Sequence, residues 1–270
     1  MKGTRADQRL VELGLAPSRE KARALIMEGM VSCDGVRLEK PGAAVGGEQT
    51  LYIKENALPY VSRGGLKLEK AIREYGLELK DKIAVDVGAS TGGFTDCMLK
   101  NGAKKVYAID VGYGQLDWRL RSDARVKVME RTNARFMTPE WFDEIPQFAS
   151  VDVSFISVRL ILPGLVNALV SGAWAVVLVK PQFEAGRGKV GKNGVVRAPE
   201  THREVLLTTA RFALDAGFAV RAVDFSPITG PKGNIEFLLI LQKNTEDARI
   251  DEETMETMVD TAIKNAHDSF

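Results

Sequence analysis

The fold is decided by the stretch DVGASTGGFT at residues 86–95. It follows the apolar run 83–87 and precedes a segment with helical spacing, so it forms the turn between a buried strand and a helix. Glycines suit such a turn because they let backbone N–H groups come close to a bound ligand, where side chains would block the approach. The spacing is G-x-x-x-G-G instead of the G-x-G-x-x-G of dinucleotide-binding proteins, which argues against NAD.

Apolar runs alternate with helical segments from residue 60 onward. The runs span residues 83–87, 105–109, 126–130, 148–153, 173–179, 218–225 and 235–241. Uninterrupted apolar runs of this length suit strands that are buried on both faces, and most of the gaps between them can hold a helix. This rhythm predicts an α/β protein with a doubly wound, mostly parallel Rossmann-like sheet.

We expect the chain to divide into three parts. Residues 1–57 have the pattern of a small α+β domain, with a helix from residue 19 to about residue 28 and two short strands around the turn Asp34-Gly35. Residues 58–242 hold the alternating sheet domain. Residues 243–270 are predicted to be a loosely attached acidic tail, although their apolar positions permit a short helix.

The composition is that of an ordinary globular protein. Hydrophobic residues make up 45% of the 270 residues and charged residues 27%, which excludes general disorder and collagen-like repeats. Cys33 and Cys97 show no partner pattern, which argues for a reducing compartment and against a structural metal site. Because the sequence shows neither an apolar run long enough to span a membrane nor a secretory signal core, we expect a cytoplasmic location.

The formal net charge of +1 hides an asymmetry. Residues 243–270 contain three Lys or Arg and eight Asp or Glu, a net of −5, so residues 1–242 carry a net of +6. A basic body suits a polyanionic partner such as RNA. The alternative is an ordinary solvated surface with an acidic tail that helps solubility.

A set of short motifs marks the N-terminal domain. They are Arg-Leu at 9–10, Ser-Arg-Glu-Lys-Ala-Arg at 18–23, Gly29, Val31, Asp-Gly at 34–35 and Lys-Pro-Gly at 40–42. This combination resembles the RNA-binding domain named after the fourth protein of the small ribosomal subunit, over about residues 5–54. The resemblance implies that a helix carrying Arg19, Lys21 and Arg23 faces RNA phosphates. The alternative for each of them is an ordinary exposed cation.

A carboxylate stands where a nucleotide site needs one. Asp110 lies 22 residues past Gly88, at the end of the second run, where it can accept hydrogen bonds from ribose hydroxyls. The glycines are not followed by Lys-Ser or Lys-Thr, which argues against ATP. The arrangement resembles that of S-adenosylmethionine-dependent methyltransferases, in which the turn holds the methionine end and a residue after the third strand touches the adenine. The resemblance implies cofactor contacts from Asp86, Gly88, Ser90, Gly92, Gly93, Phe94, Asp110 and Asn133.

Charged side chains stand at the ends of two apolar runs and within a third. Asp152 closes the fourth run, Lys180 follows the fifth, and Glu236 lies inside the last. An isolated charge in such a place is costly unless it is paired or functional. Ligands of parallel sheets bind beyond the carboxyl ends of the strands, so Asp152 and Lys180 are expected to line one crevice. Glu236 can join them only if the last strand runs antiparallel.

Four stretches carry these charges and one further lysine. They are SRGGLKLEK at 62–70, DVSFIS at 152–157, VKPQFE at 179–184 and GNIEF at 233–237. With the N-terminal domain, they resemble the TlyA family, in which an RNA-binding domain precedes an FtsJ-type ribose methyltransferase with the catalytic set Lys-Asp-Lys-Glu. The resemblance places this set at Lys67, Asp152, Lys180 and Glu236, with Lys70 as the alternative for the first lysine. It implies methylation of cytidine 2′-hydroxyls in ribosomal RNA, with S-adenosylmethionine as cofactor. We expect no metal, because the leaving group of this reaction is already activated.

The segment 182–203 is rich in glycine and in cations and directly follows Lys180. We expect it to close on substrate phosphates through Lys189 and Lys192. The alternative is a disordered, solvated loop. His202 and His267 have no ligand partners at metal-binding spacing and are expected to be structural or surface residues.

Three functions remain open from the sequence. The first is a ribosomal RNA 2′-O-methyltransferase whose partners are ribosomal RNA or ribosomal subunits and not a membrane. The second is an RNA-binding ribosome-assembly factor without turnover. The third is a membrane-active haemolysin, a name that some TlyA members carry, although the sequence shows neither a membrane span nor a strongly amphipathic cationic helix. Base methylation is disfavoured because the Asn/Asp-Pro-Pro-Tyr/Phe loop that serves an exocyclic amine does not occur in the sequence.

Overall fold

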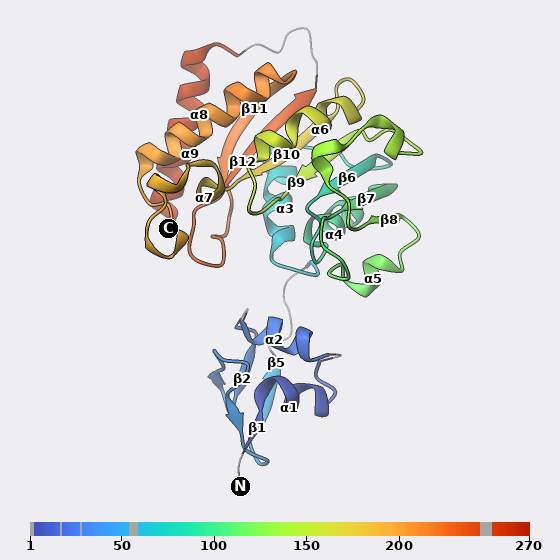
Figure 1. Ribbon diagram of the computed structural model, residues 1–270, viewed down its shortest axis with the longest axis vertical. Helices are drawn as coiled ribbons and strands as arrows, with labels where there is room; N and C mark the ends of the chain where they lie inside the picture. The colour runs from blue at the N-terminus through green and yellow to red at the C-terminus, as the bar shows by residue number, and fades with distance from the viewer. Residues whose placement is uncertain (1–2, 17, 28, 54–58, 244–249) are drawn as a thin grey trace. The chain divides into compact units, whose positions relative to one another are not determined.

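The computed structural model describes residues 3–16, 18–27, 29–53, 59–243 and 250–270. The chain separates into two compact units, residues 1–59 and residues 60–270 (Figure 1). Each unit has hydrophobic clusters of its own. The two units are therefore described one after the other.

The N-terminal unit combines two short helices with two small sheets. Its elements are β1 (Thr4–Arg5), α1 (Ala6–Glu12), α2 (Arg19–Met27), β2 (Val31–Cys33), β3 (Val36–Arg37), β4 (Ala44–Val45) and β5 (Leu51–Ile53). The hydroxyl of Ser18 accepts a hydrogen bond from the Lys21 N–H at 3.2 Å and so caps α2. Asp34 and Gly35 have φ angles of 49° and 83°, the paired positive values that a tight hairpin turn requires. We did not predict α1, because seven residues are too few to show a helical period.

The second unit is built on one seven-stranded sheet in the order β11-β12-β10-β9-β6-β7-β8. The strands are β6 (Ile83–Val87), β7 (Lys105–Ile109), β8 (Val126–Met129), β9 (Phe148–Val151), β10 (Trp174–Val179), β11 (Phe218–Phe225) and β12 (Phe237–Lys243). Strands β6 to β10 pair in parallel, whereas β12 runs antiparallel to both β10 and β11. The predicted doubly wound, mostly parallel sheet with an antiparallel last strand is confirmed.

Helices cover both faces of this sheet. They are α3 (Gly64–Tyr75), α4 (Gly93–Lys100), α5 (Trp118–Arg121), α6 (Leu162–Ala168), α7 (Pro181–Glu184), α8 (Pro199–Asp215) and α9 (Glu252–Ser269). Short 3₁₀ helices are η1 (Ala134–Phe136), η2 (Pro139–Trp141), η3 (Val158–Leu160), η4 (Arg187–Lys189) and η5 (Lys192–Gly194). Within the described ranges, no helix combines the length and the apolar character that a membrane span requires.

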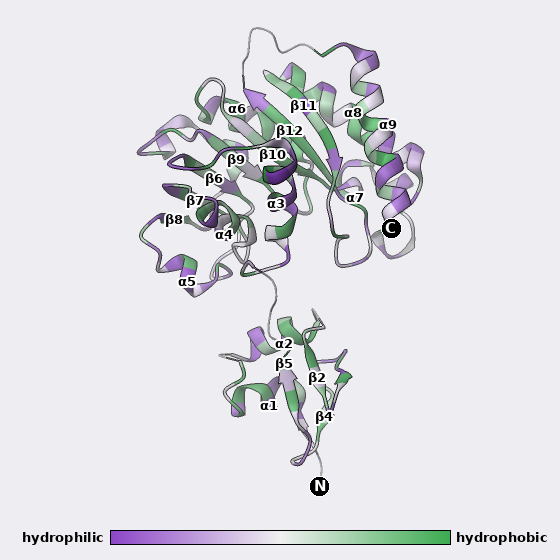
Figure 2. Ribbon diagram, turned by 180° about the vertical axis from the view of Figure 1, so that it is seen from behind, coloured by the Kyte–Doolittle hydropathy of each residue, from purple (hydrophilic) through white to green (hydrophobic). Residues whose placement is uncertain are grey.

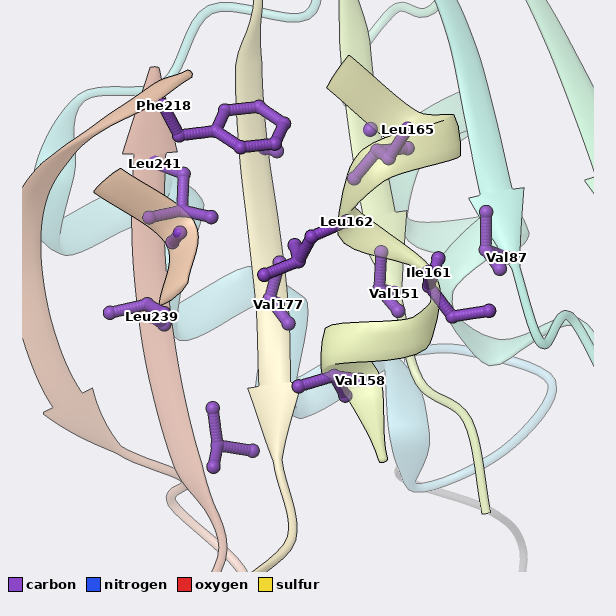
Figure 3. Close-up of a cluster of buried hydrophobic side chains, with 14 of the residues drawn as sticks. Val87, Val151, Val158, Ile161, Leu162, Leu165, Val177, Phe218, Leu239 and Leu241 are labelled. Carbon is purple, nitrogen blue, oxygen red and sulfur yellow. The ribbon is translucent and has the colours of Figure 1, made fainter. Parts of the chain in front are cut away.

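Successive strand residues pack into opposite cores, as a sheet buried on both faces demands. Val177 belongs to the core under α6, α8 and α9, whereas its neighbours Val176 and Leu178 belong to the core under α3 and α4. Figure 3 shows Ile161, Leu162 and Leu165 packed over strand residues of the first core. The strands are accordingly mostly hydrophobic in Figure 2.

The C-terminal helix α9 belongs to the second unit. Its apolar positions Met255, Val259 and Ala266 are buried in the core. Its acidic side chains pair with arginines of α8, as in the contacts of Arg203 with Glu256 and Asp260. The expectation of a loosely attached tail was therefore wrong for residues 252–269. The net charge of this segment favours a solvated tail, but the helical spacing of its apolar residues allows one face of the helix to be buried.

Candidate active site

The glycine-rich turn joins β6 to α4. Gly88 has a φ of 85°, and a Cβ atom there would lie 2.3 Å from the backbone oxygen of Asp152. Both the conformation and the close approach therefore require glycine. The backbone N–H groups of Gly88 and Ala89 both donate to the carbonyl of Ile109. The turn is thus fixed against the ends of β7 and β9.

A cavity of about 440 Å³ lies beside this turn, a volume suited to a small-molecule ligand. Its wall includes Gly88, Ser90, Asp110, Asn133 and Asp152, together with apolar side chains such as Val111 and Ile156. A smaller cavity of about 120 Å³ shares Gly88, Ser90 and Asp152 and adds Gly93 and Phe94. The two cavities therefore meet at the turn and at Asp152.

Asp110 is held in place by backbone donors. Its Oδ2 accepts a hydrogen bond from Ser90 N–H at 2.8 Å, and its Oδ1 accepts one from Gly112 N–H at 2.6 Å. Each carboxylate oxygen has a second lone pair, which leaves acceptor capacity for ribose hydroxyls. Asn133 uses its side-chain oxygen to accept from Arg135 N–H at 3.1 Å. A carboxylate and an amide on a largely apolar wall fit an adenosine.

Two of the predicted cofactor residues do not line either cavity. Asp86 is fully buried and accepts hydrogen bonds from the hydroxyls of Thr95 and Ser150 at 2.7 and 2.9 Å. Burial raises the pKa of this carboxyl to about 6. Gly92 packs against Leu120, where a Cβ would approach to 2.2 Å. Asp86 and Gly92 therefore stabilise the turn from the side of the protein core. Asp86 is a strand residue, and a strand residue next to a ligand loop can point into the core instead of towards the ligand.

The four charges predicted to be catalytic come together from four segments. Asp152 follows β9 and Lys180 follows β10, and these neighbouring parallel strands end at the same edge of the sheet. Val179 pairs with Phe237 in the antiparallel register of β10 and β12, so the next positions outward are 180 and 236. Glu236 thus lies just before β12 and not inside the strand as predicted. Lys67 reaches the group from α3.

The four side chains alternate in charge. Lys180 Nζ lies 2.5 Å from Asp152 Oδ1, and Lys67 Nζ lies 2.6 Å from Glu236 Oε2. Lys67 Nζ also lies 4.0 Å from Asp152 Oδ2, which connects the two pairs. Lys67 and Lys180 are each 8% exposed and Glu236 is 2% exposed. Charges so far withdrawn from water require partners of opposite sign, and each of the four has one.

Lys67 and Lys70 have different partners in the structure. Lys70 Nζ donates to Asp224 Oδ1 at 2.8 Å and to the carbonyl of Phe225 at 2.7 Å. It also lies 3.7 Å from the centre of the Phe225 ring. Lys70 therefore fastens α3 to the end of β11, whereas Lys67 belongs to the charged group around Asp152.

Sequence reasoning missed Ser154 and Phe155. Ser154 accepts a hydrogen bond from Lys180 Nζ at 2.9 Å. Its position two residues after Asp152 in an extended segment was the available signal, because such residues point to the same side. Phe155 is 89% exposed, has a φ of 67°, and lines the larger cavity. Sequence periodicity gives no signal for an aromatic residue that is exposed and has a positive φ.

The glycine-rich segment after Lys180 is anchored at several points. Lys189 pairs with Glu204 of α8 and lines a separate cavity with Arg159. The Asn234 side chain accepts from Val196 N–H at 3.0 Å and donates to the Gly194 carbonyl at 2.9 Å. The side chain of Lys192 lies outside the described part of the structure. Lys189 is 44% exposed beside Glu204, and its predicted contact with substrate phosphates stays a prediction.

The predicted RNA-binding cations of the N-terminal unit lie along α2. Arg19 and Arg23 are exposed, and Lys21 is half-buried. Arg19 Nη2 lies 3.3 Å from Asp7 Oδ2. Arg19 and Arg23 are one helical turn apart and are open to an external partner.

His202 lies at the C-terminal end of the glycine-rich segment 182–203 and holds it in place. It is fully buried, its Nε2 lies 3.2 Å from the Val196 carbonyl, and its Nδ1 lies 3.1 Å from His267 Nε2. Since a carbonyl only accepts, the neutral ring carries its proton on Nε2, and Nδ1 accepts from His267. Burial, followed by the proximity of His267, lowers the pKa of His202 from 6.5 to about 4.

This pKa predicts a pH dependence of stability. The unfolded chain takes up a proton on His202 below about pH 6.5, whereas the folded protein does so only near pH 4. The contribution of His202 to stability is therefore present above pH 6.5 and is lost as the pH falls towards 4. Between pH 7 and pH 5, wild type should lose about 2 kcal/mol relative to His202→Gln, measured by urea denaturation. An unchanged difference between the two proteins would contradict the assignment.

The order of the strands and the helices on both faces of the sheet are those of a Rossmann-like methyltransferase fold. A solved structure of a candidate S-adenosylmethionine-dependent methyltransferase from Listeria monocytogenes shares the fold, with a TM-score of 0.51 and 14% identity over 67% of this chain and 98% of that chain. The family model of the FtsJ-like methyltransferases matches residues 60–243, and that of the S4 domain matches residues 4–51. The chain belongs to the FtsJ-like methyltransferase family.

Three relatives are similar to this chain over most of their own length. The YqxC protein of Bacillus subtilis is 53% identical over 97% of this chain and 95% of its own. The 16S/23S rRNA (cytidine-2′-O)-methyltransferase TlyA of Mycobacterium tuberculosis is 44% identical over 90% of this chain and 91% of its own. A solved structure of a candidate hemolysin from Streptococcus thermophilus has a TM-score of 0.79 and 49% identity, covering 100% of this chain and 98% of that chain. The predicted resemblance to the TlyA proteins is confirmed.

Proposed function

We propose that this protein is a ribosomal RNA 2′-O-methyltransferase that uses S-adenosylmethionine and modifies cytidine. The observation that carries the proposal is the convergence of Lys67, Asp152, Lys180 and Glu236 beside a nucleoside-sized cavity. The choice of cytidine in ribosomal RNA rests on the activity named for the Mycobacterium tuberculosis relative.

The larger cavity is the proposed site of the cofactor. Asp110 would accept the ribose hydroxyls, Asn133 would lie at the adenine, and Gly88 would let the backbone approach the methionine end. The bound cofactor supplies a methyl group on a positively charged sulfur. Asp152 lines both this cavity and the smaller one, so the charged group adjoins the place where that methyl group must be delivered.

Asp110→Ala tests the cofactor site. Loss of hydrogen bonds to a charged acceptor costs about 1.5–3 kcal/mol, which predicts binding of S-adenosylmethionine weakened about 10- to 100-fold. Isothermal titration calorimetry measures this directly. Asp123→Ala is the matched control, because Asp123 pairs with Arg125 and does not line the cavity. Equal affinities of wild type and Asp110→Ala would contradict the proposed site.

The four charged side chains suit attack by a ribose hydroxyl, which is a poor nucleophile. The Lys180 ammonium would stabilise the negative charge that develops on O2′ as its proton is released to water. Asp152 and Ser154 fix the position of Lys180 Nζ. The pair Lys67 and Glu236 would hold the ribose, so that the oxygen lies in line with the methyl group.

Two features support RNA as the substrate. The N-terminal unit is an S4 domain that carries exposed arginines on α2. In the second unit, the exposed ring of Phe155 at the cavity offers a surface on which an unpaired base can stack. A ribose hydroxyl of a nucleotide displaced from its helix could then reach Lys180.

Methylation of isolated ribosomal components tests the proposal. The purified protein is incubated with labelled S-adenosylmethionine and either 30S subunits, 50S subunits or their RNA, and the RNA is then digested to nucleosides. Mass spectrometry should locate the label in methylated cytidine of ribosomal RNA. RNA bound without label would favour the assembly factor, and label confined to another nucleoside would refute the choice of cytidine.

A further inference from the structure

We propose that Asp7 converts Arg5 and Arg19 of the N-terminal unit into one binding site for an RNA phosphate. Arg5 ends β1, Asp7 lies in α1, and Arg19 begins α2. The inference rests on the proposed function, since it assumes RNA as the partner. It assigns a role to an acidic residue in a domain whose partner is a polyanion.

Asp7 is a buried carboxylate shared by two arginines. Its side chain is 0% exposed. Arg5 donates from Nε to Oδ1 and from Nη2 to Oδ2, both at 3.0 Å, and Arg19 Nη2 donates to Oδ2 at 3.3 Å. The backbone N–H of Gln8 also donates to Oδ1 at 3.0 Å. The hydrogen bond from Arg5 is the largest cause that lowers the pKa of Asp7 to about 2, so the carboxylate is ionised at neutral pH.

The two arginines remain exposed although the carboxylate fixes them. Their side chains are 52% and 56% exposed. The bonds to Asp7 use two of the five N–H donors of Arg5 and one of the five donors of Arg19, so donors are left for a phosphate. A planar guanidinium matches the oxygens of a phosphate in a forked pair of hydrogen bonds. Guanidinium groups that are fixed before binding lose less conformational freedom when RNA arrives.

The Lys-Pro-Gly stretch at residues 40–42 contributes to the same place. The N–H of Asp7 donates to the carbonyl of Pro41 at 3.0 Å. A Cβ at Gly42 would lie 3.1 Å from Arg5 Nη1, so the guanidinium would have to shift by a few tenths of an ångström. The stretch therefore leaves room for the Arg5 guanidinium and holds the backbone of Asp7. These contacts with Arg5 and Asp7 give a physical reason for the Lys-Pro-Gly motif, which was identified from the sequence only by resemblance.

The proposal predicts an effect opposite to that of simple charge. Removing a negative charge from a domain that binds RNA should tighten binding and steepen its dependence on salt. If Asp7 positions two phosphate-binding arginines, its neutralisation should instead weaken binding, because both guanidinium groups lose their shared anchor. Tighter RNA binding by the Asp7 variant would indicate a simple charge effect, whereas weaker binding would indicate that Asp7 positions the two arginines.

The experiment measures the affinity of the full chain for 16S and 23S ribosomal RNA over a range of salt concentrations. Asp7→Asn is expected to weaken binding about 3- to 10-fold and to reduce the salt slope by about 1. Glu20→Gln is the matched control, because it removes the same charge from the exposed surface of α2 and should leave binding unchanged or slightly tighter. Affinity for S-adenosylmethionine should be the same in all three proteins.

Arg5→Lys keeps the test valid if Asp7→Asn disturbs folding. It retains the charge of an exposed residue but cannot form the fork with Asp7, so it should also weaken RNA binding several-fold. Wild-type affinity and salt slope in either Arg5→Lys or a folded Asp7→Asn would overturn the inference. Failure of the wild-type protein to bind ribosomal RNA would instead overturn the proposed function, and the inference with it.

Discussion

Lys180→Ala is expected to lower kcat for methyl transfer to RNA by about 10²–10³-fold or more, with little change in the affinity for S-adenosylmethionine. Lys180 is the cation that Asp152 and Ser154 hold at the edge of the sheet. Without it, no ammonium group stabilises the charge that develops on the ribose oxygen, and Asp152 keeps only the more distant Lys67, at 4.0 Å, as a cationic partner. Single-turnover methylation of ribosomal RNA measures the rate, and calorimetry measures the cofactor affinity.

Lys70→Ala provides a matched control. Lys70 is also a lysine with a largely buried side chain and an aspartate partner, but its partner is Asp224 at the end of β11. Its loss should reduce the free energy of unfolding while kcat falls much less than in Lys180→Ala. Equal losses of kcat in the two variants, or near wild-type activity of Lys180→Ala, would refute the assigned role.

Gly88→Ala is expected to have the second large effect. The φ of 85° costs an alanine about 1–2 kcal/mol, and a Cβ 2.3 Å from the Asp152 carbonyl oxygen adds about 1–3 kcal/mol of overpacking. We therefore expect the free energy of unfolding to fall by about 3 kcal/mol in urea denaturation. The displaced end of β9 should also move Asp152, so that binding of S-adenosylmethionine and methyl transfer are both lost.

Gly76→Ala separates these two causes. Gly76 ends α3 with a φ of 59°, and a Cβ at this position would meet nothing within 4 Å. Only the conformational cost of about 1 kcal/mol remains, and methyl transfer should be unaffected. Equal destabilisation of the two variants, or normal cofactor binding by Gly88→Ala, would contradict the account of the turn.

The fold could be predicted from the sequence because buried strands are long and uniformly apolar. The predicted runs 83–87, 105–109 and 218–225 coincide with β6, β7 and β11. The last run was placed two residues early, since the apolar Ile235 extends the pattern beyond the hydrogen-bonded strand. Periodicity carries no information on strand direction, so the antiparallel β12 followed only from the need to bring Glu236 to the site.

The site could be predicted as far as local sequence determines it. Asp152 and Lys180 stand at strand ends, which a parallel sheet brings to one edge. Long-range contacts could not be predicted from the sequence. Spacing, for example, cannot distinguish Lys67 from Lys70, which are three residues apart on one helix. The spacing of residues also could not show that the Asp86 side chain points into the core or that Asp7 accepts hydrogen bonds from two arginines. These depend on which distant groups share a contact.

The alkali stability of the methylated RNA tests the central claim most directly. In alkali, a free ribose 2′-hydroxyl attacks the adjoining phosphodiester and cleaves the chain, and a methyl group on O2′ prevents this. After reaction with labelled S-adenosylmethionine and alkaline hydrolysis, the account predicts that the label stays in resistant dinucleotides with the wild-type protein and is missing with Lys180→Ala. Label released entirely in mononucleotides would show methylation of a base and would contradict the account.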